Sequence, residues 1–303
     1  MNGKKRKILM LTVTEDCNLK CLYCYENHKT PRAMELGIAK AAIERHFRDS
    51  NSFDELQIEF FGGEPFIQFE LIKIICDWVL SKSWAKPYLF FATTNGTLIH
   101  GKTQDWVYRN KERISLALSL DGLPEMHNYN RSGSFNKIDC RFFANTWPKQ
   151  PVKMTVSMHS LPFLAQGVVF LHNMGFKVDG NLAQGIDWSD AANITLVADQ
   201  LDKLVLFYVN HPEIEPSSFL SMDIQRATQE SVPIIKWCGV GTEMVAVGID
   251  GQEYPCHIFQ PYSADLPCAS SNKANSSYSL GCGSTCSGGC YGGCSGDCAG
   301  TRK

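Results

Sequence analysis

The chain has 303 residues, of which 44% are hydrophobic and 20% charged, and its formal net charge is −2. This composition is ordinary for a globular protein of one or two domains, and the small net charge provides no basic field to attract nucleic acid or an anionic membrane. No apolar run approaches the roughly 18 residues of a membrane span, and the apolar stretch 8–13 is too short for a secretory signal. We therefore expect a cytoplasmic protein that binds neither nucleic acid nor membrane.

Six short runs with strand character alternate with segments whose apolar residues recur at helical spacing. The predicted strands are residues 8–14, 56–61, 88–94, 114–120, 152–158 and 177–182. Helices are predicted over 36–47 and near 68–83, 103–111, 136–146 and 161–174. Repeated strand–helix units favour an α/β fold with a parallel sheet, which right-handed connections would curl into a partial (β/α)6 barrel of the TIM type. Binding sites in such folds gather at the carboxyl ends of the strands.

The sequence pattern changes after about residue 185 and again near residue 236. We predict a barrel over 1–185, a helical linker over 186–235 with one helix at 190–210, and a cysteine-rich region over 236–303. In the last region, two alternating segments around an Asp250-Gly251 turn predict a hairpin that ends at Cys256. The residues beyond it are rich in Ser, Gly and Cys and cannot bury a core, so we expect them to fold around metal.

The chain contains 13 cysteines, which is many for a cytoplasmic protein. In a reducing compartment, metal ligation explains such a number better than disulfide bonds do. Cys76 and Cys140 stand apart from the others, and Cys76 shares a helical face with Ile72, Ile75 and Val79. We interpret both as core residues, which leaves two groups of cysteines for metal.

The first group is Cys17, Cys21 and Cys24, spaced C-x3-C-x2-C directly after the first predicted strand. A cubane iron–sulfur cluster that only carries electrons takes four thiolates. Three cysteines in one loop would leave one iron open to a substrate or cofactor. A zinc site with a remote fourth ligand, or a disulfide plus one thiol, are the alternatives, although zinc sites favour paired C-x2-C knuckles and only half of that pattern is present.

Two further motifs follow the second and third predicted strands. The motif Gly62-Gly63-Glu64-Pro65 combines glycines that let the backbone approach a ligand with a carboxylate that can accept from an ammonium group. A glycine turn before a helix would have the same sequence. Thr94 and Asn95 belong to a TTNGTL segment, for which a simple Asn-Gly turn is the alternative.

A fourth motif, S-x-D-G followed by H-x3-R, comes after the fourth predicted strand. It contains Ser119, Asp121, His127 and Arg131. An arginine can form a bidentate charge pair with a ligand carboxylate. For His127, a packing role and a role in the site are both open.

The cysteine spacing, with Tyr23 just before the last cysteine, resembles the signature of the radical S-adenosylmethionine (radical SAM) superfamily. The resemblance covers residues 8–185 and implies a [4Fe–4S] cluster on Cys17, Cys21 and Cys24. In that family the open iron is chelated by the amino and carboxylate groups of the methionine moiety of SAM. An electron from a flavodoxin or ferredoxin then leads to a 5′-deoxyadenosyl radical that abstracts hydrogen from the substrate.

The resemblance also implies a SAM pocket. The Gly-Gly-Glu-Pro motif would hold the methionine amino group, Ser119 the ribose or carboxylate, Arg131 the carboxylate, and the Tyr23 backbone would lie near the adenine. The implied cofactor-binding residues are Tyr23, Gly62, Gly63, Glu64, Pro65, Thr94, Asn95, Ser119, Asp121 and Arg131.

The second group of cysteines follows residue 237. Its opening, Cys238-x12-Gly251-x4-Cys256, is similar to that of the auxiliary-cluster domains called SPASM and twitch. A full SPASM domain continues differently, whereas this chain repeats a cysteine every fourth residue from 282 to 298. We expect one or two auxiliary [4Fe–4S] clusters, with zinc or a thiol-rich tail without fixed structure as alternatives. The candidate ligands are Cys238, Cys256, Cys268, Cys282, Cys286, Cys290, Cys294 and Cys298.

A radical SAM core with auxiliary clusters resembles the maturases that modify peptides. The expected function is hydrogen abstraction from a ribosomally made peptide to form a thioether, a carbon–carbon crosslink or an epimer. No catalytic acid or base can be assigned from the sequence. Because the first strand begins near residue 8, we expect the precursor to be delivered by a separate recognition protein or bound directly by the barrel and the 190–235 segment.

Three alternatives stay open. An anaerobic sulfatase maturase forms formylglycine, but that family has an Asp after the first auxiliary cysteine, where this chain has Gly239. The second alternative is an enzyme of the same superfamily that modifies a small molecule. A non-catalytic iron–sulfur electron carrier or scaffold is the third, and the SAM motifs argue against it.

Overall fold

The computed structural model describes residues 5–48, 53–220 and 243–263. Strands and helices alternate through most of this part, and each of the six predicted strands is present. The elements that build the barrel are β1 (Arg6–Thr14), α1 (Leu36–Arg48), β2 (Glu55–Gly62), α2 (Phe69–Leu80), β3 (Tyr88–Thr94), α3 (Gly101–Arg109), β4 (Ile114–Leu118), α4 (Pro124–Asn130), α5 (Cys140–Thr146), β5 (Val152–Val156), α6 (Leu164–Asn173) and β6 (Val178–Leu182). They are followed by α7 (Ala191–Asn210), β7 (Met244–Val247) and β8 (Glu253–Tyr254).

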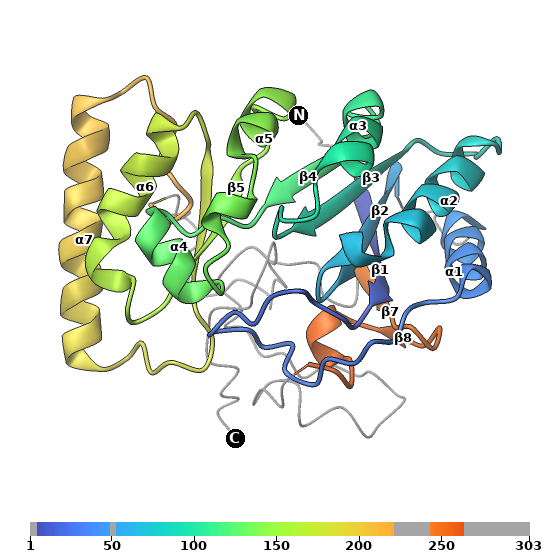
Figure 1. Ribbon diagram of the computed structural model, residues 1–303, viewed down its shortest axis with the longest axis horizontal. Coiled ribbons are helices and arrows are strands. Elements are labelled where there is room, and N and C mark those ends of the chain that lie inside the picture. Colours follow the sequence, from blue (N-terminus) through green and yellow to red (C-terminus); the bar gives the residue numbers. More distant parts are fainter. Residues whose placement is uncertain (1–4, 49–52, 221–242, 264–303) are drawn as a thin grey trace, which may run out of the picture.

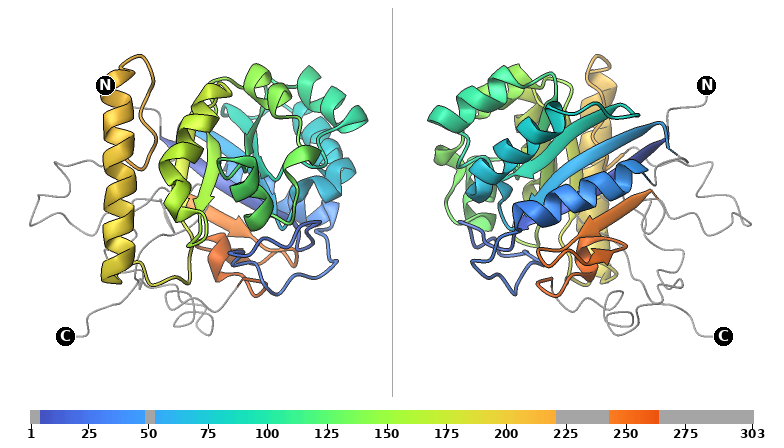
Figure 2. Two further views of the ribbon diagram at one scale, coloured as in Figure 1. Left: turned by 60° about the vertical axis from the view of Figure 1, so that its left-hand side comes forward. Right: turned by 90° about the vertical axis from the view of Figure 1, so that its right-hand side faces the viewer.

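The strands form a partial barrel, as predicted. One sheet has the order β4-β3-β2-β1-β7-β8, with β1 to β4 parallel, and β5 pairs with β6 in a second parallel sheet. A bridge between Ser119 and Lys153, with a 2.9 Å hydrogen bond from Leu120 N to Lys153 O, joins the two sheets just beyond β4. Figures 1 and 2 show the strands curving around a common interior, with the helices on the outside.

Side chains alternate between the two faces of the barrel strands, because successive residues of a strand point to opposite faces. On β2, Leu56, Ile58 and Phe60 belong to the main hydrophobic core, whereas Glu59 and Phe61 line a cavity inside the barrel. The helices add apolar residues to the same core, including Cys76 and Cys140. The interpretation of these two cysteines as core residues is therefore confirmed.

The predicted hairpin forms, and it extends the barrel sheet. Strand β7 pairs in parallel with β1, from Ile8 opposite Met244 to Leu11 opposite Val247, and β8 returns antiparallel to β7. The hairpin therefore packs against the first strand of the barrel (Figure 1). A separate domain over 236–303 remains a prediction, because residues 236–242 and 264–303 lie outside the described residues.

Several boundaries differ from the prediction. β4 and β5 end at Leu118 and Val156, two residues early, and the short helix α4 was not predicted. The predicted helix at 136–146 begins only at Cys140, where the Asp139 side chain caps it by accepting a hydrogen bond from Phe142 N.

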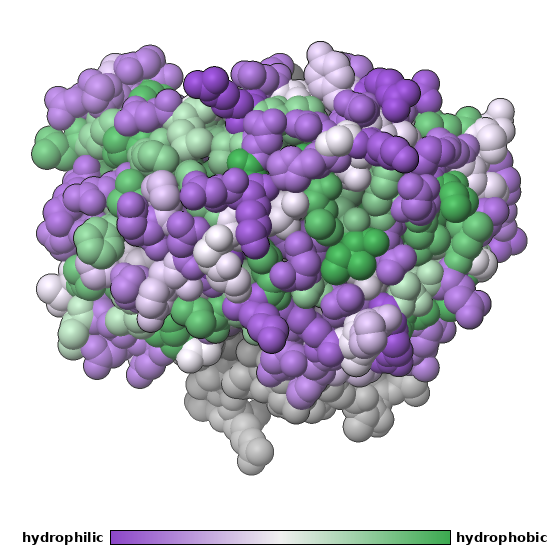
Figure 3. Space-filling view, viewed as in Figure 1, coloured by the Kyte–Doolittle hydropathy of each residue, from purple (hydrophilic) through white to green (hydrophobic). Residues whose placement is uncertain are grey.

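The described surface is mixed in character. On the face shown in Figure 3, polar side chains are interspersed with apolar ones. Among the described residues, no helix combines the length and apolarity required to cross a membrane.

Candidate functional site

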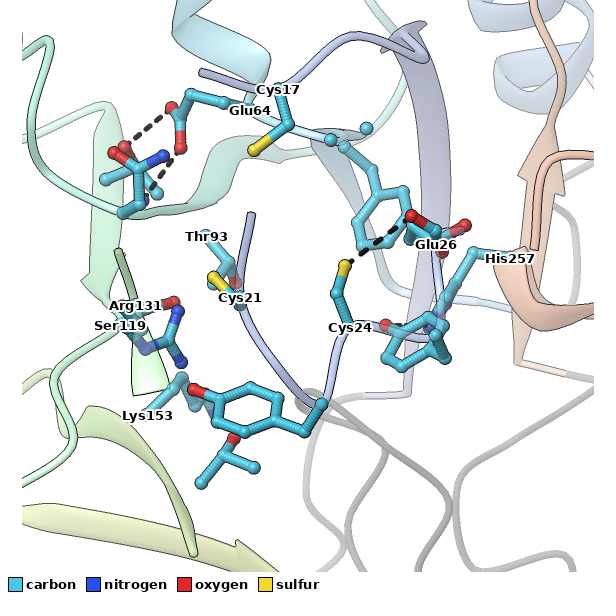
Figure 4. A pocket seen from close by; sticks show the side chains of 18 of the residues that line it. Cys17, Cys21, Cys24, Glu26, Glu64, Thr93, Ser119, Arg131, Lys153 and His257 are labelled. Carbon is cyan, nitrogen blue, oxygen red and sulfur yellow. Dashed lines mark hydrogen bonds between the residues drawn. The ribbon is translucent and has the colours of Figure 1, made fainter. Parts of the chain in front are cut away.

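A cavity inside the barrel collects most of the predicted site residues (Figure 4). Its walls come from the cysteine loop after β1, from inward-facing residues and the carboxyl ends of the barrel strands, and from the residue after Cys256. The predicted residues that line it are Cys17, Cys21, Tyr23, Cys24, Gly62, Gly63, Glu64, Thr94, Asn95, Ser119 and Arg131. Pro65 and Asp121 are buried behind this lining.

The three cysteines of the loop are partly buried and face the same cavity. Burial raises the pKa of the Cys17 thiol to about 11 and also raises the pKa of Cys21. As ligands, the thiolates therefore require a nearby positive charge, which a metal centre supplies. Among the described residues, no three His, Cys, Asp or Glu side chains are close enough to share one metal ion. Three thiols that face one cavity suit a cubane cluster, in which each thiolate binds a different iron.

The end of β2 presses closely against the cysteine loop. A Cβ atom on Gly62 would lie 2.1 Å from the carbonyl oxygen of Thr14, and one on Gly63 would lie 2.3 Å from that of Asp16 and 2.8 Å from Cβ of Cys17. Gly62 also has a φ of 147°. Glycines are expected here so that a ligand can approach, and in the structure the cysteine loop itself also occupies the space that a side chain would need.

We expect Gly63→Ala to displace the cysteine loop, to lower stability by about 1–3 kcal/mol through overpacking, and to reduce the iron bound on anaerobic reconstitution. Iron analysis and thermal unfolding measure the two effects. Gly37→Ala on α1 is the matched control, because a Cβ there meets no atom within 4 Å. Full iron content in the Gly63→Ala protein would contradict the prediction.

Glu64 connects the Gly-Gly-Glu-Pro motif to the turn after β3. Its carboxylate accepts hydrogen bonds from Thr94 Oγ1 at 2.7 Å, Asn95 N at 2.8 Å and Phe66 N at 3.2 Å. Burial raises the pKa of Glu64 to about 7, although these donors act to lower it. Asn95 Nδ2 in turn donates to Asn18 Oδ1 of the cysteine loop at 2.9 Å. The carboxylate, which lines the cavity, has lone pairs left for a ligand ammonium group.

Asp121 organises the side of the cavity that carries Arg131. Fully buried, it accepts hydrogen bonds from Arg131 Nε at 3.0 Å, from Asn130 Nδ2 at 3.2 Å and from Thr155 N at 3.0 Å, as well as from the hydroxyl of Tyr23. The guanidinium carbon of Arg131 lies 5.3 Å from the centre of the Tyr23 ring. Asp121 thus orients other residues from behind the cavity wall.

Figure 4 places Arg131 near Cys21 and Ser119. Burial acts to lower the pKa of Arg131, but its neighbours, Asp121 first, raise it by more, so the side chain stays charged. A charged guanidinium beside the cysteines suits a ligand carboxylate.

His127 has a packing role. Its ring is fully buried, Nδ1 accepts from Asp121 N at 3.3 Å, and Nε2 lies 2.9 Å from Ser134 Oγ. Burial lowers the pKa of His127 to about 4, so the ring is neutral at physiological pH.

The cavity also has walls that the sequence did not indicate. They include Glu59, Lys153, Thr155, Asn181, Gln184 and His257. His257 Nε2 lies 2.9 Å from the hydroxyl of Tyr25, and its ring centre is 4.4 Å from that of Phe61. Most of these residues occupy the inward-facing positions of their strands. The alternation of inward and outward positions along each strand is the signal that could have revealed them.

Of the second cysteine group, the structure describes Cys256 alone. It is buried, and its Sγ lies 3.4 Å from Nδ1 of His257. The other predicted ligands, Cys238, Cys268, Cys282, Cys286, Cys290, Cys294 and Cys298, lie outside the described residues.

A family model described as a 4Fe-4S single cluster domain matches residues 2–136. An uncharacterized protein from Methanocaldococcus jannaschii is 36% identical over 117 residues, which are 39% of each chain. The radical SAM cyclopropyl synthase TigE from Paramaledivibacter caminithermalis is 28% identical over 149 residues, 44% of this chain and 30% of the relative. A GTP 3′,8-cyclase from Clostridium acetobutylicum is 26% identical over 133 residues, 43% and 41% of the two chains. The match thus spans less than half the length of each relative.

The fold is similar to that of solved structures with bound S-adenosylmethionine (AdoMet). Native anSMEcpe with bound AdoMet aligns with a TM-score of 0.68 at 19% identity, covering 83% of this chain and 74% of that one. SuiB of Streptococcus suis bound to S-adenosylmethionine aligns with a TM-score of 0.61 at 17% identity, covering 85% and 62%. Further structures contain anSMEcpe with Kp18Cys peptide and SuiB with its precursor peptide SuiA. The family match includes the segment that carries Cys17, Cys21 and Cys24, so this part of the chain is similar to a 4Fe-4S cluster domain, and the chain is similar over less than half its length to radical SAM enzymes, which use SAM and a [4Fe–4S] cluster.

Proposed function

We propose that the protein is a peptide maturase that abstracts hydrogen from a ribosomally made peptide. The observation that carries the proposal is the meeting of Cys17, Cys21, Cys24, Glu64 and Arg131 in one cavity at the carboxyl ends of parallel strands. Two radical SAM proteins of similar fold have structures with bound peptides, which supports a peptide as the substrate.

Each group has a distinct role in this proposal. The three cysteines would hold the cluster, and Arg131, oriented by Asp121, would bind the carboxylate of SAM. Glu64 would accept from the amino group of SAM. When bound, cluster and SAM supply a carbon-centred radical able to remove hydrogen from carbon. The partly enclosed cavity would shield that radical from solvent.

The product would be a thioether, a carbon–carbon crosslink or an epimer. A separate recognition protein could present the peptide, and a flavodoxin or ferredoxin would supply the electron. Formylglycine formation by a sulfatase maturase is the alternative, and the similarity to anSMEcpe is compatible with it.

The test uses anaerobically reconstituted enzyme with SAM, a reductant and synthetic peptides encoded by neighbouring reading frames. We expect 5′-deoxyadenosine to form together with a mass change in one peptide. Two competing substrates are tested in parallel. One is a sulfatase-derived peptide with Cys at the target position, and the other is GTP. Turnover of either competitor, with no change in any neighbouring peptide, would overturn the proposal.

We also propose that residues 236–303 hold one or two auxiliary [4Fe–4S] clusters. With two of them, reconstituted enzyme should contain roughly 12 irons per chain, because each cubane holds four. A chain truncated after Ser263 should bind fewer irons and lose peptide modification, yet still cleave SAM. This end point keeps two contacts to the cysteine loop region: Ser263 Oγ donates to Glu26 at 2.7 Å, and Tyr262 O accepts from His28 N at 3.0 Å. Full iron and peptide modification after truncation would contradict the auxiliary-cluster prediction.

A further inference from the structure

The barrel interior contains a group of charged side chains that the roles above leave unused. Glu59 of β2 and Lys153 of β5 line the cavity, and Lys153 forms an ion pair with Asp179 of β6. On each of these strands the neighbouring residues point outward into the hydrophobic core, including Ile58 and Met154. Strand alternation thus fixes Glu59 and Lys153 on the inside of the barrel.

Glu59 is a buried carboxyl with little compensation. The described residues give it one hydrogen bond, from Gln57 Nε2 to its Oε2 at 3.2 Å, and Gln57 Oε1 accepts from Arg6 Nη1 at 3.2 Å. Residue Glu59 is only 6% exposed, and burial raises its pKa to about 7. Because an undercompensated buried carboxyl costs free energy, its place in a cavity wall indicates a ligand partner.

The position of Glu59 separates it from the motifs assigned to SAM. It precedes Gly62, the last residue of β2, by three positions, which corresponds to about 10 Å along the strand. The cysteines, Glu64 and Arg131 lie at or beyond the carboxyl ends of the strands. Glu59 therefore lies deeper in the barrel, where a group of the substrate can reach it.

The surrounding charges define which group fits. Lys153 brings positive charge to the opposite wall, and its electrostatic interaction with Glu59 counteracts the rise in the carboxyl pKa. Lys153 would repel a cationic side chain of the substrate, and Glu59 would repel an anionic one. A neutral hydrogen-bond donor, such as a hydroxyl or a side-chain amide, would satisfy the carboxyl without adding charge.

We propose that Glu59, opposite Lys153, forms a subsite that accepts a hydrogen bond from a neutral polar side chain of the substrate. This subsite rests on the proposed peptide-modifying function, since it assigns part of the same cavity to the peptide. It selects hydroxyl or amide side chains over apolar side chains of equal size.

The experiment compares N-acetyl-threonine amide with N-acetyl-valine amide, which differ by a hydroxyl in place of a methyl group. Both probes are titrated into anaerobic, SAM-loaded holoenzyme and followed by saturation-transfer NMR. We expect the threonine probe to bind about fivefold more tightly, as one buried hydrogen bond would give. In Glu59→Leu the two probes should bind equally. In Glu59→Gln the preference should fall to about twofold, because a neutral acceptor is weaker than a carboxylate.

Glu55→Gln is the matched control on the same face of β2, because Glu55 pairs with Arg6 and does not line the cavity. It should keep the full preference, and Glu59→Leu should keep the SAM affinity. Equal binding of the two probes to the unaltered enzyme would overturn the subsite. A loss of SAM affinity in Glu59→Leu with the threonine preference intact would also overturn it, by assigning Glu59 to the adenosyl group. Failure of the proposed function is separately visible, as absence of peptide modification by the unaltered enzyme.

Discussion

Replacing Cys17, Cys21 and Cys24 together by Ala is expected to abolish reductive cleavage of SAM. The three thiols face one cavity beside Arg131 and Glu64, and none of the other cysteines that the structure describes (Cys76, Cys140 and Cys256) lines it. Without them, the described part of the chain has no thiolate set for a cluster with an open iron. The measurement is 5′-deoxyadenosine formed under reducing, anaerobic conditions, and we expect none above the rate without enzyme.

Two further measurements distinguish loss of the cluster from loss of the fold. The triple variant should bind about four fewer irons per chain, the content of one cubane, and should keep whatever iron the C-terminal cysteines hold. Cys140→Ala is the control: this cysteine is buried at the start of α5, away from the cavity, so iron content and SAM cleavage should persist. Continued 5′-deoxyadenosine formation by the triple variant would contradict the assignment of the cluster site.

The barrel strands could be predicted from the sequence because their outward faces are apolar. In β2, Leu56, Ile58 and Phe60 pack under the helices. Apolar residues at every second position are the main signal in the sequence of this strand. The motifs at the strand ends were also predictable, since a parallel sheet brings them to one edge. Predicting that these motifs lie close together required no knowledge of contacts between residues far apart in the sequence.

The deeper part of the site could not be predicted in the same way. Glu59 and Lys153 lie in strands that were recognised, but only closure of the barrel places β2 and β5 around one cavity. The pairing of β7 with β1 joins residues more than 230 positions apart, and no local signal specifies it. His257 reaches the cavity through that pairing.

The glycines of the second motif were predicted correctly, but the structure shows a second reason why glycine is needed at these positions. Gly62 and Gly63 were expected to make room for a ligand. In the structure their hydrogens face carbonyl oxygens of Thr14 and Asp16, so they also hold the cysteine loop close to β2. Short-range sequence reasoning misses this, because the contact depends on how the loop folds back.

Arg131→Ala is expected to weaken both SAM binding and folding. The sequence alone indicated a ligand carboxylate as the partner of this arginine. The structure pairs it with Asp121, and the Asp121 side chain is 0% exposed. Breaking such a buried pair leaves an uncompensated charge and typically costs about 3–5 kcal/mol. Hydrogen bonds from Tyr23, Asn130 and Thr155 reduce that cost, so we expect the lower end for urea unfolding of the cluster-free chain.

A double variant separates the two effects. In Arg131→Ala combined with Asp121→Asn, the buried negative charge is removed as well, so much of the lost stability should return. SAM affinity should not return, because the guanidinium that would bind the SAM carboxylate is still absent, and loss of one member of a desolvated charge pair costs about 2–5 kcal/mol of binding. An anaerobic SAM titration of each reconstituted variant measures this directly. If the double variant regained both stability and SAM affinity, Arg131 would serve only to neutralise Asp121, and the carboxylate-binding role would be wrong.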